Sequence, residues 1–323
     1  MGLDERVQRL IRAVAENDIR LARKMALEAL DADKTQKNRW FVNKYKAILT
    51  SEGANMIELP GNLRDIMLCE DVSLSFKEGR YYLTDRGRKI YEEIARMVRV
   101  SGKLMEMQIP YRNATLLYGP PGTGKTMFGR YVAYRMGLPF CYLNFSRVVD
   151  SYMGGTAKNI AQAFTYASAN PCVFMLDEVD VISGNRAKPG DGSPDREIGR
   201  VTVTLMQEMD RLANDVVVIA ATNRLELLDE AFVSRCSLKC GMEPFTKEES
   251  RAMVHQFLGD VGVEFPPDRI EAIIQGGDDQ RSVMNRLVLA IADQVLANDH
   301  SGTEKTGNCG AERRGNIMMT RSR

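Results

Sequence analysis

The spacing of hydrophobic residues changes several times along this chain. In residues 1–49 they recur three or four positions apart, which is the spacing of amphipathic helices. The first such helix has its hydrophobic positions at Val7, Leu10, Ile11 and Val14. A second is expected after Asn17-Asp18, which can cap it, and a third from about Thr35. The third carries Trp40, Phe41, Tyr45 and Ile48 on one side. We therefore predict a helical N-terminal region over residues 1–49, a small bundle or set of hairpins.

Residues 50–85 show no helical spacing. Glycine and proline separate short segments in which apolar and polar residues alternate or β-forming residues cluster. Two such segments are Val72–Phe76 and Arg80–Leu83. We expect a linker or a small β element here, such as a hairpin, and a return to helix from about Asp85 to Val98.

From Ala114 onward, short apolar runs alternate with helical segments. Strands are expected at residues 115–118, 140–144, 173–177, 216–221 and 237–242. Helices are expected between them, at about residues 125–135, 157–167, 197–212 and 227–234. This alternation is typical of an α/β fold, with a parallel five-stranded sheet covered by helices on both faces. We assign this α/β domain to residues 86–244.

Beyond Pro244 the spacing is helical again. Helices are expected at residues 247–258, 268–274 and 281–296, which we group as a small helical domain over residues 245–298. Residues 299–323 are polar and rich in Gly, Thr and Arg, and we expect a disordered tail.

Composition restricts the class of protein but not its chemistry. The 323 residues are 44% hydrophobic and 27% charged, which suits a soluble chain of more than one domain. The net charge of +1 argues against a protein that coats nucleic acid, although a local basic patch stays possible. The apolar run Val216–Ala221 is far short of the roughly 20 residues of a membrane-spanning helix, so we expect no membrane insertion.

The cysteines and the first residues indicate the compartment. The six cysteines are scattered without a C-x-x-C pair, and only two histidines accompany them, so we expect no structural zinc site. The start, Met1–Glu5, has no apolar segment typical of a secretory signal. We therefore expect a cytoplasmic protein with reduced cysteines.

One motif carries specific chemistry. Between a predicted strand and a predicted helix, eight residues fit the phosphate-binding pattern G-x-x-x-x-G-K-[ST]. They are Gly119, Pro120, Pro121, Gly122, Thr123, Gly124, Lys125 and Thr126. In such a P-loop the backbone N–H groups surround a phosphate, helped by the N-terminus of the helix that follows. Lys125 is expected on the β and γ oxygens and the Thr126 hydroxyl on Mg²⁺, so ATP and Mg²⁺ are the predicted ligands.

Two acidic residues stand at the end of the second predicted strand after the P-loop. The run Val173–Leu176 is apolar and ends in Asp177 and Glu178. A buried parallel strand delivers such residues to the sheet edge where phosphates bind. Asp177 is expected to hold Mg²⁺ through water, and Glu178 to orient and deprotonate the attacking water.

A P-loop followed by an apolar strand that ends in Asp-Glu resembles the AAA+ ATPases, and the resemblance spans residues 86–298. The strand before Asn223 resembles the AAA strand that ends in the sensor 1 residue, which in this family helps to position the lytic water. Arg235 occupies the arginine-finger position, and its context Ser234-Arg235-Cys236 is similar to that of replication clamp loaders. A finger acts on the neighbouring subunit's nucleotide, so the resemblance implies a ring, with a homo-hexamer as the first expectation.

The resemblance also covers the C-terminal helices and one loop. Residues 279–287 resemble a clamp-loader lid whose sensor 2 arginine falls on Arg281, with Arg286 as the alternative. Tyr152-Met153-Gly154 matches the aromatic-hydrophobic-glycine pore loop of protein-remodelling AAA enzymes. An aromatic ring beside a flexible methionine can grip varied peptide backbones.

Two functions stay open at this stage. The pore loop and the balanced charge favour an ATPase that remodels, unfolds or disassembles a protein substrate. The clamp-loader-like finger and lid leave an alternative, an ATPase of loader or initiator type that acts on nucleic acid or on a DNA-bound assembly. The basic residues of the N-terminal region suit such a partner but are also typical of a solvated helix face.

Overall fold

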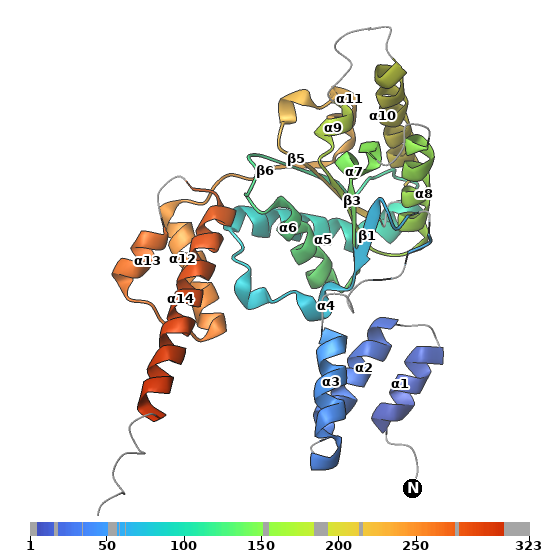
Figure 1. Ribbon diagram of the computed structural model, residues 1–323. Coiled ribbons are helices and arrows are strands. Elements are labelled where there is room, and N and C mark those ends of the chain that lie inside the picture. Colours follow the sequence, from blue (N-terminus) through green and yellow to red (C-terminus); the bar gives the residue numbers. More distant parts are fainter. Residues whose placement is uncertain are drawn as a thin grey trace, which may run out of the picture. The chain divides into compact units, whose positions relative to one another are not determined.

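The computed structural model describes residues 5–15, 19–33, 35–50, 57, 59–61, 63–150, 155–183, 193–212, 216–274 and 278–306 (Figure 1). The chain divides into two compact units, Met1–Glu243 and Pro244–Arg323, which are described separately.

A six-stranded sheet forms the centre of the first unit. Its strands are β1 (Met67–Glu70), β2 (Ala114–Tyr118), β3 (Phe140–Asn144), β4 (Val173–Asp177), β5 (Val217–Thr222) and β6 (Leu238–Gly241). Their order is β1-β3-β4-β5-β2-β6. The five predicted strands are confirmed, and they pair with one another in parallel, as predicted. The sixth strand, β1, was not predicted and pairs antiparallel with β3.

The small β element expected as one alternative for residues 50–85 is present as the strand β1, but the segments Val72–Phe76 and Arg80–Leu83 do not form a hairpin. Residues Val72–Ser75 form a single helical turn, α4, and Glu78–Arg80 form a 3₁₀ turn. Asp71 caps α4, because its carboxylate accepts a hydrogen bond of 2.9 Å from the Ser73 N–H. A local cap of this kind outcompetes weak β propensity. The strand of this segment is instead β1, which is held by pairing with a distant strand.

Helices cover both faces of the sheet, as predicted. On one face α8 (Thr156–Ala169) and α10 (Ser193–Arg211) pack with α7 (Phe145–Asp150) and α9 (Asp180–Ser183). On the other face α6 (Lys125–Met136) packs with α4 and α5 (Asp85–Glu106). Neighbouring strand residues alternate between the two cores, so that Phe174 and Leu176 face the first group and Val173 and Met175 the second. Burial on both faces is the reason why these strands read as continuous apolar runs.

The N-terminal region is helical, as the spacing predicts. It contains α1 (Glu5–Ala15), α2 (Ile19–Ala32) and α3 (Arg39–Thr50), with α1 and α3 each in contact with α2. The apolar side expected on α3 does not form a core, because Trp40 is 70% exposed and Phe41 is 50% exposed.

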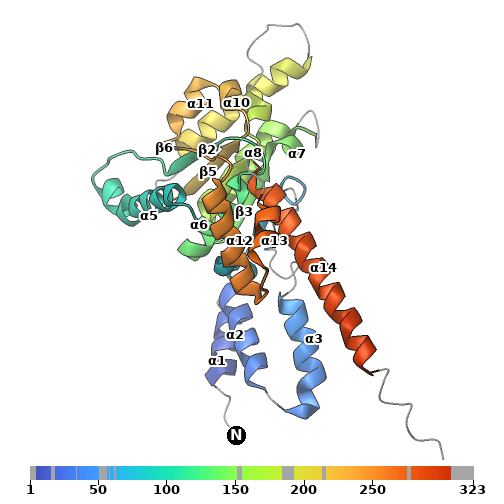
Figure 2. The same cartoon turned by 90° about the vertical axis from the view of Figure 1, so that its left-hand side faces the viewer.

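The second unit is helical. It contains α12 (Lys247–Val261), α13 (Pro267–Ile273) and α14 (Gln280–Thr306), which contact one another (Figure 2). A capping box starts α12, in which Thr246 and Glu249 exchange side-chain and backbone hydrogen bonds. The disordered tail expected from residue 299 is wrong as far as Thr306, because α14 continues to that residue. Residues 307–323 lie outside the described part of the chain.

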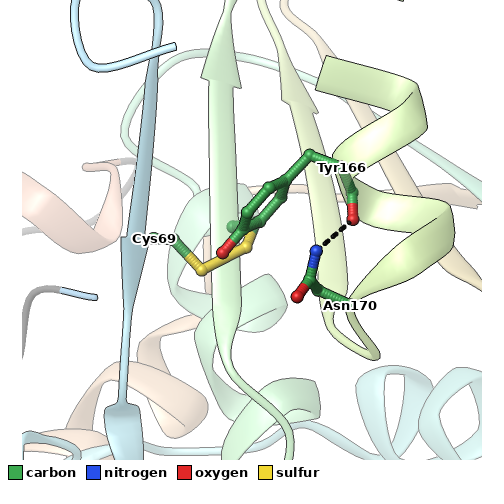
Figure 3. The surroundings of a disulfide bond; sticks show 4 residues. Cys69, Tyr166 and Asn170 are labelled. Atoms are coloured by element: carbon green, nitrogen blue, oxygen red, sulfur yellow. Dashed lines mark hydrogen bonds between the residues drawn. A yellow bond between two sulfur atoms is a disulfide. The ribbon is translucent and has the colours of Figure 1, made fainter. Parts of the chain in front are cut away.

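The expectation of reduced cysteines is wrong for one pair. Cys69 of β1 and Cys141 of β3 lie opposite each other in register and form a disulfide, with 4.1 Å between their Cα atoms. Tyr166 of α8 and Asn170, the residue after that helix, lie beside it (Figure 3). Cys172, Cys236 and Cys240 are free and buried. No described helix is both long enough and apolar enough to cross a membrane.

Candidate active site

The P-loop runs from the end of β2 to the start of α6. Three of its glycines, Gly119, Gly122 and Gly124, have φ angles of 143°, 81° and 84°, which other residues rarely adopt. A Cβ atom on Gly119 would also lie 2.0 Å from the carbonyl oxygen of Met242. Glycine is therefore required at residue 119 both by backbone conformation and by space.

Lys125 is held over this loop. Its side chain is buried in the fold, and its Nζ atom donates hydrogen bonds of 2.8 Å to the carbonyl oxygens of Gly119 and Pro120. The Thr123 hydroxyl donates to the same Pro120 oxygen at 2.9 Å. The loop thus keeps an ammonium group next to the backbone N–H groups that a phosphate would contact.

Thr126 and Asp177 meet although they are far apart in sequence. The Thr126 hydroxyl donates a hydrogen bond of 3.0 Å to Oδ2 of Asp177. Burial raises the pKa of Asp177, while the hydrogen bonds that its carboxylate accepts act in the opposite direction. Hydroxyl and carboxylate oxygens are ligands that suit Mg²⁺.

This pair of side chains fits a magnesium ion that is bound together with a phosphate. The described residues contain no group of three or more His, Cys, Asp or Glu side chains arranged for a metal. A Mg²⁺ ion held by Thr126 and Asp177 therefore needs water and phosphate oxygens to complete its six ligands.

Glu178 leaves β4 in an uncommon backbone conformation. Its φ angle is 57°, in the left-handed region, which for a residue with a side chain costs on the order of 1–3 kcal/mol. Hydrogen bonds on both sides hold this turn: the Glu178 N–H donates to Oδ1 of Asp177 at 3.0 Å, and the Val179 N–H donates to the Ala221 carbonyl at 3.2 Å. Strained residues of this kind are concentrated at functional sites.

Two polar residues of β3 that were not predicted from the sequence also belong to this site. The Tyr142 hydroxyl donates to Oδ2 of Asp177 at 3.1 Å, and the Asn144 amide donates to the Tyr142 oxygen at 3.1 Å. Burial raises the pKa of Tyr142 to about 12, so the phenol keeps its proton. The signal in the sequence was the position of Asn144, which ends a predicted strand and lies opposite Asp177 in the parallel register.

Asn223 lies at the same sheet edge. It is exposed and directly follows β5, whose neighbour β4 ends in Asp177. The buried Thr222 beside it donates a hydrogen bond of 2.7 Å to Asp180 and accepts one of 2.9 Å from the Arg224 N–H. The carboxyl ends of β2, β4 and β5 thus bring the P-loop, the two acidic residues and Asn223 to one edge.

Arg235 ends α11 (Glu230–Arg235) and is held in a fork. Its Nε and Nη2 atoms each donate to a different oxygen of Asp210 at 2.9 Å, and Nη1 donates to the Ala231 carbonyl at 2.7 Å. Arg112 forms a second ion pair with Asp210 at 2.8 Å. Hydrogen bonds from Arg235 lower the pKa of Asp210. No pattern in the sequence singles out Asp210 on α10.

The two candidate sensor 2 arginines lie on α14 of the second unit. Arg286 is engaged inside that unit, where Nε donates to the Ile273 carbonyl at 2.8 Å and Nη2 pairs with Asp278. Arg281 is exposed. This difference favours Arg281 as the arginine available to a ligand. The predicted pore-loop residues Tyr152, Met153 and Gly154 lie outside the described residues.

One family model matches the part of the chain that contains this site. Residues 115–244 match the model of the ATPase family associated with various cellular activities (AAA). The matched segment contains the P-loop, both acidic residues, Asn223 and Arg235.

Curated relatives include 26S proteasome subunits. The subunit RPT4 of Saccharomyces cerevisiae is 38% identical over 154 residues, which cover 47% of this chain and 35% of that protein. The regulatory subunit 10B homolog A of Arabidopsis thaliana is 36% identical over 173 residues, which cover 52% of this chain and 43% of that protein. The chain therefore matches less than half the length of these relatives.

Solved structures support the fold. The crystal structure of the FIGL-1 AAA domain has a TM-score of 0.52 and 24% sequence identity, covering 69% of this chain and 76% of that one. The same domain in complex with ADP has a TM-score of 0.51 over 70% of this chain and 77% of that one.

Proposed function

We propose, from the premise that residues 115–244 form an AAA domain, that this chain hydrolyses ATP and uses the energy to unfold, remodel or disassemble a protein substrate. One observation carries the ATPase part. The hydroxyl of Thr126, the last residue of the P-loop motif, lies 3.0 Å from the Asp177 carboxylate, and Glu178 follows in a strained turn.

The side chains divide the work of phosphoryl transfer. The P-loop N–H groups and Lys125 bind the phosphates, and Thr126 with Asp177 would hold Mg²⁺, which neutralises phosphate charge when bound. Glu178 accepts the proton of the attacking water, and Asn223 orients that water. Tyr142 donates a hydrogen bond to Asp177 and so limits its rotation.

Arg235 supports assembly into a ring, which we propose to be a homo-hexamer. Arg235 lies at the end of α11, and its three guanidinium nitrogens donate hydrogen bonds within this subunit, to Asp210 and to the Ala231 carbonyl. Contact with a neighbouring subunit's nucleotide therefore requires the fork with Asp210 to open. The guanidinium would then offset negative charge in the transition state on the adjoining subunit. Arg281, from a lid over residues 245–298, is proposed to contact the nucleotide within the same subunit.

The protein substrate is inferred from two features. Relatives of this chain include subunits of the 26S proteasome, and Tyr152-Met153-Gly154 matches the sequence pattern of an aromatic pore loop. We propose that these residues grip the substrate chain and that the protein acts in the cytoplasm, with residues 1–85 choosing the target. An ATPase of loader type acting on a nucleic-acid-bound assembly is the competing function.

Substitution of Tyr152 tests the remodelling function. Tyr152→Ala is expected to lower ATP-dependent unfolding of a model protein substrate at least about tenfold, because the loop loses the ring that grips the chain. ATP hydrolysis should stay within about twofold of the unmodified protein. Tyr152→Phe keeps the ring and serves as the matched control. Equal unfolding by all three proteins would refute the pore-loop function without affecting the ATPase assignment.

A further inference from the structure

The helix α3 presents aromatic rings and lysines to solvent. Trp40, Phe41 and Tyr45 are 70%, 50% and 39% exposed, and Lys44 is also exposed. In a helix, positions 40, 41, 44 and 45 lie on one side. We call these four residues, with the exposed Lys37 one turn earlier, the aromatic-basic face.

The opposite side of α3 faces α2. Arg23 of α2 donates to the Leu49 carbonyl, and Lys46 pairs with Asp31 at 2.5 Å. These contacts turn the aromatic-basic face away from α2, so its exposure follows from how α3 is attached.

The rings and the ammonium groups of this face are arranged together. The ring centroids of Phe41 and Tyr45 lie 4.4 Å apart, and Nζ of Lys44 lies 4.7 Å from the Trp40 centroid and 5.7 Å from that of Tyr45. Among the described residues neither Lys37 nor Lys44 has a carboxylate partner. Residues 36–46 contain four basic residues and no acidic one.

The composition of this face determines the partner that it fits. The positive charge without acidic residues is complementary to an anionic partner. The exposed apolar groups of residues 36–46 are all aromatic rings, whereas the single aliphatic side chain, Val42, is half-buried. Proteins that bind single-stranded nucleic acid present flat aromatic rings interleaved with cations. Every base can stack on such a ring, and every phosphate carries a charge that pairs with a cation.

We propose that the aromatic-basic face of α3 binds single-stranded nucleic acid, with bases stacked on Trp40, Phe41 and Tyr45 and phosphates paired with Lys37 and Lys44. This inference does not depend on the ATPase assignment. It gives the N-terminal region a ligand of its own, which would bring the ATPase to assemblies on single strands.

Trp40 provides a direct readout, because it is the only tryptophan of the chain. Titration of the full-length protein with oligothymidylate at low salt is expected to quench its fluorescence saturably, since stacking on a base quenches indole. Each phosphate contact on a single strand contributes about −0.7 to the slope of log K against log salt. Lys37→Glu with Lys44→Glu should therefore make the slope shallower by about 1.4.

The variants are measured by anisotropy of a fluorescein-labelled oligothymidylate, about 16 nucleotides long, so that loss of Trp40 does not remove the signal. Trp40→Ala with Phe41→Ala is expected to weaken binding at least about tenfold, because two stacking contacts are lost. Lys89→Glu with Arg99→Glu makes the same charge change on exposed positions of α5 and should leave binding within about twofold. Helix content by circular dichroism confirms that each variant is folded.

Three results would overturn the proposal. The first is no binding of the oligonucleotide at low salt. The second is an equal loss of binding in the α5 control. The third is tighter binding of polyglutamate or of anionic phospholipid vesicles than of oligothymidylate, which would assign the face to an acidic protein segment or to a membrane surface.

Discussion

The nucleotide edge of the sheet and its edge strand β1 differ in one bond, because β1 is cross-linked to β3 by a disulfide. At the carboxyl ends of β2, β4 and β5, side chains are joined by hydrogen bonds such as Thr126–Asp177, and Tyr142 of β3 also donates to Asp177. At the edge strand β1, the Cys69–Cys141 disulfide joins the strand to β3, and Arg130 pairs with Glu70 at 3.0 Å. Hydrogen bonds can rearrange when a nucleotide binds, whereas a disulfide fixes the strand. We therefore expect the hydrogen bonds at the nucleotide edge to change when a ligand binds, whereas β1 keeps its place beside β3.

Removing the disulfide is expected to have the largest effect, and it tests whether β1 is held covalently to β3. Its cysteines are separated by 72 residues, and a loop of that length corresponds to about 4 kcal/mol of stabilisation. Cys69→Ala with Cys141→Ala should lower the free energy of unfolding by about that amount in urea titrations. A reductant should have the same effect on the unmodified protein and none on the variant. Insensitivity of the unmodified protein to reductant would show that this edge is not held covalently.

The next largest effect is expected from a substitution in the P-loop, at the nucleotide edge of the sheet. Gly119→Ala places a methyl group where the Met242 carbonyl oxygen lies and strains a left-handed backbone, at a cost of about 2–4 kcal/mol. Nucleotide affinity, measured with a fluorescent ATP analogue, should fall at least about tenfold. Gly199→Ala is the matched control, because that glycine lies in α10 with open space around it. It should stabilise the protein by roughly 0.5–1 kcal/mol. Similar losses in both variants would contradict the steric argument.

The smallest expected effect concerns Tyr142. Tyr142→Phe removes a hydrogen bond to the Asp177 carboxylate, worth about 1.5 kcal/mol, and frees that carboxylate to rotate. The Mg²⁺ concentration that gives half-maximal nucleotide binding should rise up to about tenfold. Tyr134→Phe, a half-buried tyrosine of α6, is the control. An unchanged Mg²⁺ dependence would show that Tyr142 only packs against the site.

The nucleotide edge and β1 also differ in how well the sequence predicts them. The five parallel strands were found because burial on both faces makes them continuous apolar runs, and the P-loop because its function requires glycines at fixed spacing. β1 was missed because four residues are too few to show a period, and its pairing partner lies far along the chain.

Within the site, the missed features depend on tertiary structure. The left-handed φ of Glu178 is imposed by hydrogen bonds to its neighbours and to β5, which no local pattern encodes. In the sequence Tyr142 is an ordinary strand residue, and its contact with Asp177 depends on the pairing of β3 with β4. Asp210 becomes meaningful only when α10 and α11 bring it to Arg235. The residues of motifs are visible in sequence, whereas the residues that position them are not.

The central claim is that Glu178 activates water for ATP hydrolysis next to the Thr126–Asp177 pair, and single-turnover hydrolysis of bound ATP tests it most directly. The unmodified protein is compared with Glu178→Gln and with Glu230→Gln, an exposed acid of α11 that serves as the control. Glu178→Gln should bind ATP with an affinity within about threefold of normal and hydrolyse it at least about 100-fold more slowly, because the amide cannot accept the proton. Hydrolysis by Glu178→Gln at the rate of the unmodified protein would contradict the account.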